Sequence, residues 1–235
     1  MARTGKPWAV VITAVLCALV AASALATASA LRSRGTPDST PRTTTSPSTS
    51  GVGIKGCLVE PCTVLATVPV AGATVELVVD NGGRSGRLRI GGAGASKVIE
   101  ATITSMGATL TTDSLQCVPN SLSACLLHGP YAQGVVGQVV VGRSSKWSEI
   151  TQPFQSDAGY LALSDITADV GAEVLAAQHR CDRETGADCA STPVYVQVYN
   201  LRAQQLGCTR DYSRLESLPG WPVVTLTSAS LKPCV

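Results

Sequence analysis

Histidine and aromatic residues are scarce in this chain, which has 2 His, 3 Trp, 5 Tyr and 1 Phe among 235 residues. A Ser-His-Asp or Cys-His enzyme needs a histidine base, and the candidates are His128 and His179. Neither has an activated serine near it in the sequence, and no His-Glu-x-x-His metalloprotease motif is present. The sequence therefore argues against histidine-dependent catalysis.

A concentration of positive charge is also missing. From residue 54 onward there are 13 Lys and Arg against 15 Asp and Glu, a net charge of −2, so the value of +2 for the whole chain comes from its N-terminal part. Nucleic-acid-binding domains carry basic patches that neutralise phosphates, so no nucleic-acid partner is expected. The group Arg84, Arg87 and Arg89 is either a solvated strand face or a contact for an anionic polymer of the cell envelope.

Cysteine pairs with the C-x-x-C spacing of zinc and redox sites are absent, although the chain has 9 Cys. One of them, Cys17, lies in an apolar run, and the other eight follow residue 54. An even number of cysteines in an exported protein predicts disulfides, although sequence alone does not decide their connectivity. Short segments rich in turn residues separate three pairs of neighbouring cysteines and favour the bridges Cys57–Cys62, Cys117–Cys125 and Cys181–Cys189. The two cysteines that are left would then form Cys208–Cys234.

Charge is absent from residues 7–31, a run of 25 positions that follows Arg3 and Lys6. At about 1.5 Å per residue, a helix of this length crosses a hydrocarbon core of about 30 Å. The run predicts a signal-anchor that holds the protein in the membrane as a single-pass protein with an extracellular C-terminal domain. The alternative is a signal peptide cleaved near Ala30, after which the protein is secreted.

Two further regions follow this export segment. Residues 32–53 are almost wholly Ser, Thr, Pro and Gly, and they cannot bury enough apolar surface to offset the entropy of ordering. They predict a disordered extracellular stalk. Residues 54–235 are long enough for one domain with its own core, and we expect this domain to lie outside the cell.

The pattern of residues 54–235 is mainly that of β-strands. Runs such as TVLATVPV, ATVELVVD and PVYVQVYNL are rich in Val, Thr and Tyr and end at turn residues. DNGGR after ATVELVV predicts a hairpin turn. Residues 172–180 fit either a short helix or a strand. We predict an all-β, disulfide-stabilised antiparallel sandwich, with a small or degenerate propeller-like β fold as the alternative.

Carboxylates recur at a spacing of four in LALSDITADVGAEVLAAQ, residues 161–178. The segment resembles the calcium-loop repeat of the FG-GAP and VCBS families, in which an acidic loop joins two apolar strands of a propeller blade. The resemblance covers residues 147–201 and implies calcium, with ligands at the first, third, fifth and ninth loop positions: Asp165, Thr167, Asp169 and Glu173.

Two functions of different classes follow from these features. The first is a non-catalytic extracellular module, tethered or secreted, that binds a cell-envelope glycan or a protein partner. Trp147 and Trp221 are either core anchors for such a module or platforms that stack on sugar rings. The second is a secreted hydrolase with an unrecognised carboxylate site that uses Asp165, Asp169 or Glu173.

Overall fold

The computed structural model describes residues 59–95, 97–143, 145–167, 169–181 and 189–234. The chain divides into two compact units, Met1–Ser50 and Gly51–Val235, and every described residue lies in the second. The predicted export segment, the predicted stalk and Cys57 lie outside the described residues. Within the described ranges, no helix is long and apolar enough to cross a membrane.

Three antiparallel sheets follow one another along the chain. The first sheet contains β1 (Thr63–Val70), β2 (Ala73–Val79), β3 (Gly86–Ile90) and β4 (Lys97–Glu100) in this order. The middle sheet contains β5 (Leu115–Val118), β6 (Ser123–Tyr131), β7 (Gly134–Arg143) and β8 (Lys146–Glu149), with β9 (Phe154–Ser156) also paired to β7. The third sheet contains β10 (Leu161–Ser164), β11 (Glu173–His179), β12 (Val194–Tyr199) and β13 (Gln205–Cys208).

Helical structure in the described residues is limited to short 3₁₀ turns. These are η1 (Gly92–Gly94), η2 (Thr102–Met106), η3 (Cys189–Ser191), η4 (Leu215–Ser217) and η5 (Ser228–Ser230). Apart from β9, which pairs with β7, every strand pairs with its neighbour in the sequence, so most connections inside a sheet are local. The predicted antiparallel β fold is therefore confirmed.

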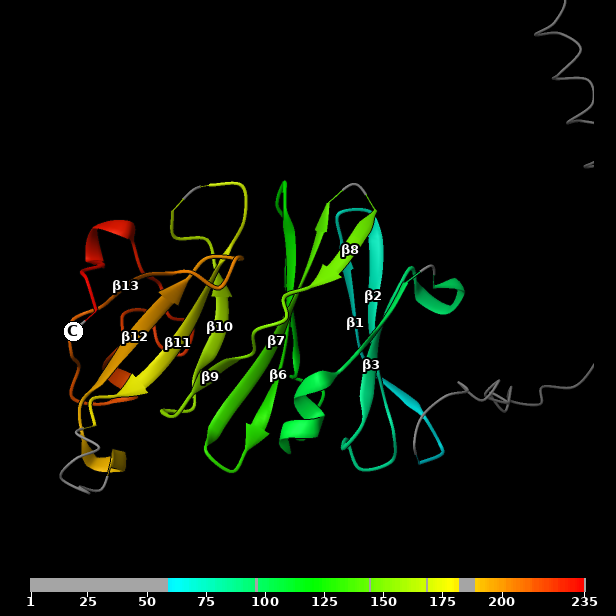
Figure 1. Cartoon of the computed structure of the whole chain (residues 1–235), viewed down its shortest axis with the longest axis horizontal. Coiled ribbons are helices and arrows are strands. Elements are labelled where there is room, and N and C mark those ends of the chain that lie inside the picture. The colour runs from blue at the N-terminus through cyan, green and yellow to red at the C-terminus, as the bar shows by residue number, and fades with distance from the viewer. Residues whose placement is uncertain (1–58, 96, 144, 168, 182–188, 235) are drawn as a thin grey trace, which may run out of the picture. The chain divides into compact units, whose positions relative to one another are not determined.

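The middle sheet lies between the other two (Figure 1). One core joins it to the first sheet through residues such as Leu77, Leu88 and Leu127. A second core joins it to the third sheet through residues such as Leu126 and Val174. Because successive residues of a strand point to opposite faces, a strand that is buried on both faces needs an unbroken apolar run. The sequence CLL within β6 and VVV within β7 meet this need.

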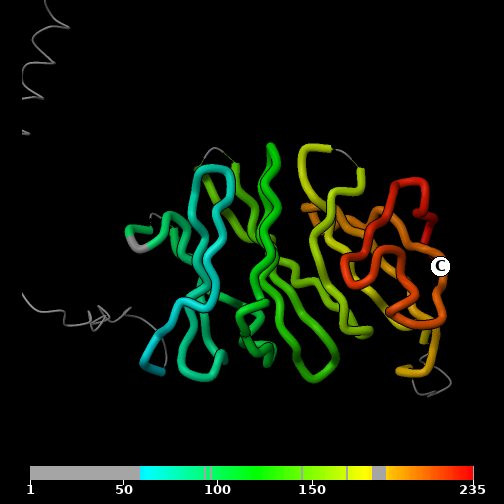
Figure 2. The backbone as a smooth tube through the Cα atoms, turned by 180° about the vertical axis from the view of Figure 1, so that it is seen from behind, coloured from blue at the N-terminus to red at the C-terminus, as the bar shows by residue number. Residues whose placement is uncertain are grey.

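The outer side of the third sheet is covered by the end of the chain. Leu218, Val224 and Leu226 of this C-terminal segment pack on Val196 and other residues of the sheet. Figure 2 shows the segment, coloured orange to red, beside the third sheet. The third sheet is thus supported on one face by the C-terminal segment and on the other by the middle sheet.

The predicted hairpin turn between β2 and β3 is confirmed. Gly82 and Gly83 have φ of 114° and 68°, a region that residues with a Cβ atom rarely occupy. A Cβ atom on Gly83 would also lie 2.3 Å from the carbonyl oxygen of Leu110. The buried Asp80 carboxylate accepts hydrogen bonds from the backbone N–H groups of Arg84 and Ser85, both at 3.0 Å. The turn is fixed by backbone requirements that were visible in the sequence.

Three of the predicted disulfides are confirmed, and the fourth involves Cys57. Cys117 and Cys125 are directly opposite each other on β5 and β6. The other two bridges are Cys181–Cys189 and Cys208–Cys234. The last bridge joins the end of β13 to the C-terminal segment, so it helps to hold that segment on the third sheet.

Candidate functional site

Glu173, the last residue of the predicted calcium loop, is buried at the start of β11 and is 1% exposed. Its Oε2 accepts a hydrogen bond of 2.8 Å from the backbone N–H of Ile166, and its Oε1 accepts one from the hydroxyl of Thr167. Both oxygens of Glu173 therefore bind the loop that precedes the strand.

The two aspartates of this loop are exposed. Oδ1 of Asp169 accepts a hydrogen bond of 2.9 Å from the N–H of Gly171, which fixes the turn into β11. Asp169 and Glu173 also line a hollow of about 290 Å³, which Asp165 does not line. Throughout the part of the chain that the structure describes, no group of three or more His, Cys, Asp or Glu side chains is placed to hold a metal ion. The calcium site stays a prediction.

The segment that resembles an FG-GAP blade, residues 147–201, is divided between two sheets. Its first part contributes β8 to the middle sheet, and β9 also pairs there. Its later part forms β10, β11 and β12 of the third sheet. The family resemblance itself stays a prediction.

The tryptophans differ in their surroundings. Trp147 is 9% exposed and belongs to the core between the first and middle sheets, where its indole lies over Gly142. A Cβ atom on Gly142 would come within 2.5 Å of that ring, so the close approach needs glycine. Trp221 is 36% exposed and lies against Tyr160, with ring centroids 5.7 Å apart. Trp147 is a core anchor, and Trp221 offers an accessible ring.

Two of the three clustered arginines have acidic partners. Arg89 Nη2 lies 2.7 Å from Glu76 Oε2 on the neighbouring strand, and Arg87 lies 3.9 Å from Glu100. These pairs neutralise charge on the outer face of the first sheet. His128 lies in the middle sheet, where burial lowers its pKa and Asp113 partly opposes the change. The lowered pKa keeps this imidazole neutral at pH 7.

A polar groove of about 450 Å³ lies between β9 and the strands β11 and β12. No sequence pattern had predicted this groove. Its lining is rich in side-chain amides and tyrosine rings, with Asp157 and His179 at one wall. These amides and rings include Gln155, Gln178, Gln197, Tyr195 and Tyr199.

The alternation of β12 places one wall of the groove. Val194, Val196 and Val198 are buried, whereas Tyr195, Gln197 and Tyr199 are partly exposed on the opposite face. Tyr199 packs with the core between the middle and third sheets, against the ring of Phe154 at a centroid distance of 5.6 Å. Farther along the strand, Tyr195 and Gln197 line the groove instead of that core.

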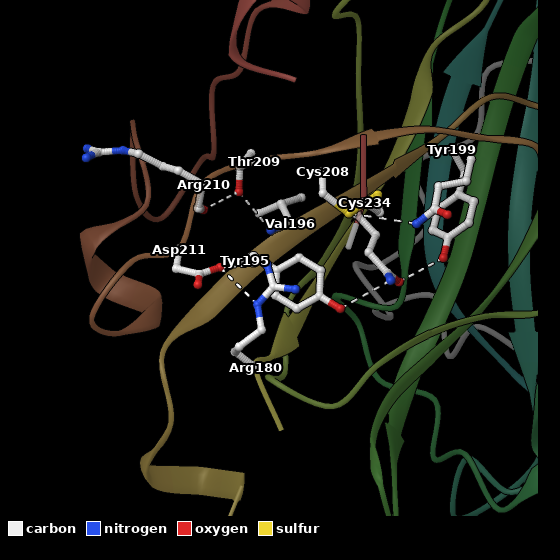
Figure 3. Close-up of a disulfide and its surroundings, with 11 residues drawn as sticks. Arg180, Tyr195, Val196, Tyr199, Cys208, Thr209, Arg210, Asp211 and Cys234 are labelled. Carbon is white, nitrogen blue, oxygen red and sulfur yellow. Dashed lines mark hydrogen bonds and ion pairs between the residues drawn. A yellow bond between two sulfur atoms is a disulfide. The ribbon is translucent and has the colours of Figure 1, made fainter. Parts of the chain in front are cut away.

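The polar groups of this wall form one hydrogen-bond chain. The hydroxyl of Tyr199 donates to Oε1 of Gln197 at 2.8 Å, and Nε2 of Gln197 donates to the hydroxyl of Tyr195 at 3.3 Å. The guanidinium carbon of Arg180 lies 3.8 Å from the centre of the Tyr195 ring, and Arg180 also binds Asp211 at 2.7 Å (Figure 3). The ring is therefore held in place before any ligand arrives.

The opposite wall is held by the side chain of Gln178. Its Nε2 donates to the carbonyl oxygen of Gln155 at 2.6 Å, and its Oε1 accepts from the N–H of Asp157 at 3.3 Å. Asp157 Oδ1 in turn accepts from the N–H of His179 at 2.7 Å and lies 3.4 Å from His179 Nδ1. These contacts join β9, and the residue that follows it, to β11 beside the groove.

The comparisons with known proteins leave the family open. No family model, no curated protein and no solved structure matches this chain. The chemistry of the groove therefore follows from its own side chains.

The serine next to the groove is not placed to act as a nucleophile. Ser156, next to Asp157, is fully buried, and its hydroxyl donates to the carbonyl of Ala177 at 2.6 Å while accepting from the N–H of Tyr160 at 3.0 Å. A serine nucleophile needs its hydroxyl directed at the base and the substrate, and this one is engaged with backbone. Burial, together with nearby Tyr195, raises the pKa of Tyr199, so its hydroxyl stays a neutral donor at physiological pH.

The signal that marked the groove was present in PVYVQVY, where valine alternates with tyrosine and glutamine. Such alternation indicates one buried face and one polar face. What the sequence did not contain was the second wall, because β9 and β12 are brought together by the packing of two different sheets.

Proposed function

We propose that this protein is an exported, non-catalytic binding module that recognises a component of the cell envelope through the polar groove. The observation that carries the proposal is the hydrogen-bond chain Tyr199–Gln197–Tyr195 along one wall. Ligand sites are concave and use a few fixed polar groups to orient what they bind, and this wall supplies such groups on a strand.

Export is supported by the cysteines and by the uncharged N-terminal run. Disulfides persist outside the cytoplasm, and three cross-link the described residues. Residues 7–31 would tether the module to the membrane and residues 32–53 would hold it away from the surface. Cleavage near Ala30 would release the same module in secreted form.

The architecture is best described as an extension of the predicted sandwich to three sheets. Two cores between face-to-face sheets support this description. Three meanders fall short of the roughly four blades from which closed propellers begin. The stack gives the groove its walls, because one wall comes from the middle sheet and the other from the third.

The binding function can be tested with the full chain and insoluble envelope from the producing organism. In a sedimentation assay, wild-type protein should pellet with envelope in a saturable manner. Gln197→Ala should weaken binding about 10-fold, because it breaks the chain of hydrogen bonds at its centre. Gln204→Ala is the matched control, since Gln204 is exposed on the turn between β12 and β13.

Equal binding by the two variants would show that the groove is not the recognition site. The absence of any saturable binding by the wild-type protein would remove the proposed function altogether.

A further inference from the structure

The hydrogen-bond chain of the groove has a direction and two ends with different properties. Tyr199 donates its hydrogen to Gln197, so its oxygen remains an acceptor. Tyr195 receives a hydrogen from Gln197, so its own hydroxyl hydrogen remains a donor. Residues that alternate along a strand are about 7 Å apart, so this wall presents a spaced series of polar groups. A ligand with several hydroxyl groups matches it, because each hydroxyl both donates and accepts.

The charge of the groove argues for a neutral ligand. Among the described residues that line it there is no Lys or Arg, and the carboxylate there belongs to Asp157. The nearby Arg180 is held by Asp211 at 2.7 Å and by the Tyr195 ring. A phosphate-rich polymer would meet Asp157 without a lysine or arginine in the lining to offset the repulsion.

The backbone of the groove argues against an added peptide strand. Such a peptide binds by hydrogen bonding to unpaired backbone groups at the edge of a sheet. The carbonyl of Gln155 on β9 and the N–H of Asp157, just after β9, are both occupied by the side-chain amide of Gln178. The hydroxyl of Ser156, between them, binds the backbone of β11. Two backbone groups of the edge that faces the groove are therefore already occupied.

The rings are also fixed in advance. Arg180 lies against Tyr195 and Phe154 lies against Tyr199, so neither tyrosine has to be ordered when a ligand binds. Fixed aromatic side chains with a polar tip provide contact area and hydrogen bonds at a low entropic cost.

From these four features we infer that the groove binds a neutral carbohydrate chain of the envelope. The inference rests on the proposed binding function and specifies its ligand. The hydroxyl of Tyr195 donates to a sugar hydroxyl, and the hydroxyl oxygen of Tyr199 accepts from another. The ring of Tyr195 lies beside the sugar.

The experiment divides the envelope by chemistry. One sample is oxidised with periodate, which cleaves vicinal diols of sugars, a second is digested with protease, and a third is left untreated. The full chain, with its disulfides intact, is sedimented with each. We expect binding to the untreated and protease-digested samples, and loss of at least 10-fold in affinity for the periodate-treated sample.

A pair of variants connects this result to the groove. Tyr195→Phe removes the donor at the end of the chain and should weaken binding about 3- to 10-fold, the effect of one neutral hydrogen bond. Tyr212→Phe is the matched control, because Tyr212 also lies under an arginine, Arg210 at 4.9 Å, but outside the groove. Circular dichroism confirms that both variants are folded.

Each outcome has a definite consequence. Binding that survives periodate and is lost after protease would overturn the carbohydrate inference while leaving a groove-dependent binding module in place. Equal binding by Tyr195→Phe and Tyr212→Phe would also overturn it. No binding to the untreated envelope would remove the proposed function itself, which is a different result from the loss of the carbohydrate ligand.

Discussion

The acidic loop before β11 and the groove wall on β12 are two polar regions of the same sheet, and they use their polar groups differently. In the loop, both oxygens of Glu173 bind the loop's own backbone and hydroxyl groups. The wall carries a hydrogen-bond chain of Tyr195, Gln197 and Tyr199. The hydroxyl groups at its two ends can each make a further hydrogen bond. The difference shows that residue type alone does not identify a site, because spare hydrogen-bonding capacity decides what remains for a ligand.

The largest effect on stability is expected in the acidic loop and not on the groove wall. Glu173→Ala leaves the buried N–H of Ile166 without its partner and should lower the free energy of unfolding by about 2–3 kcal/mol. Gln197→Ala removes two side-chain hydrogen bonds at a half-buried position and should lower the free energy of unfolding by only about 1 kcal/mol. Urea unfolding of both variants measures the two values.

Glu173→Gln is the control for this comparison, since it retains an acceptor for the Ile166 N–H and should cost less than Glu173→Ala. If Glu173→Ala proves as stable as wild type, the carboxylate does not support the loop and becomes available for another role.

A smaller effect is expected when calcium is added to the wild-type protein. If the oxygens of Glu173 are retained by the loop, 5 mM calcium should leave the Tm within about 1 °C of its value in chelator. If the calcium concentration were about 100 times the Kd of a site in the folded protein, binding would add about 2.7 kcal/mol to the free energy of unfolding. The Tm would then rise by several degrees. Such a rise, lost in Asp165→Ala, would show that the loop rearranges around an ion as the FG-GAP resemblance implies.

The smallest expected effect concerns Tyr199, whose pKa is raised by burial and by nearby Tyr195. Since unfolding releases this hydroxyl to ionise at the ordinary tyrosine pKa of about 10, its contribution to stability is complete below that pH and is lost as pH rises through the higher folded value. Tyr199→Phe should therefore flatten the fall in stability above pH 10. Parallel curves for variant and wild type, measured by urea unfolding at pH 9 to 11, would contradict the partial burial of this hydroxyl.

Local features account for most of what was predictable. The DNGGR turn needs positive φ at Gly82 and Gly83, and glycine supplies it wherever the turn lies in the fold. The bridge Cys117–Cys125 joins neighbouring strands across a short turn-rich segment. Both depend on residues close together in the sequence, so pattern and spacing were sufficient.

The secondary structure of residues 172–180 could not be predicted from local sequence. Their alanine-rich sequence fits a helix or a strand, and the structure places Glu173–His179 in β11 because β10 and β12 pair with it on either side. Its alternate residues enter different cores, with Val174 facing the middle sheet and Leu175 facing the C-terminal segment. Tertiary burial on both faces selected the strand.

By itself, the sequence indicated the strands and the tight turns and favoured the pairing of neighbouring cysteines, because each follows from backbone sterics, side-chain alternation or short chain closure. Only the tertiary structure decided that both oxygens of Glu173 bind the loop before β11 and that Gln155 and Tyr195 line the same groove. The physical reason is that hydrogen-bonding capacity is shared among groups distant in sequence, and their distribution is fixed when the sheets pack.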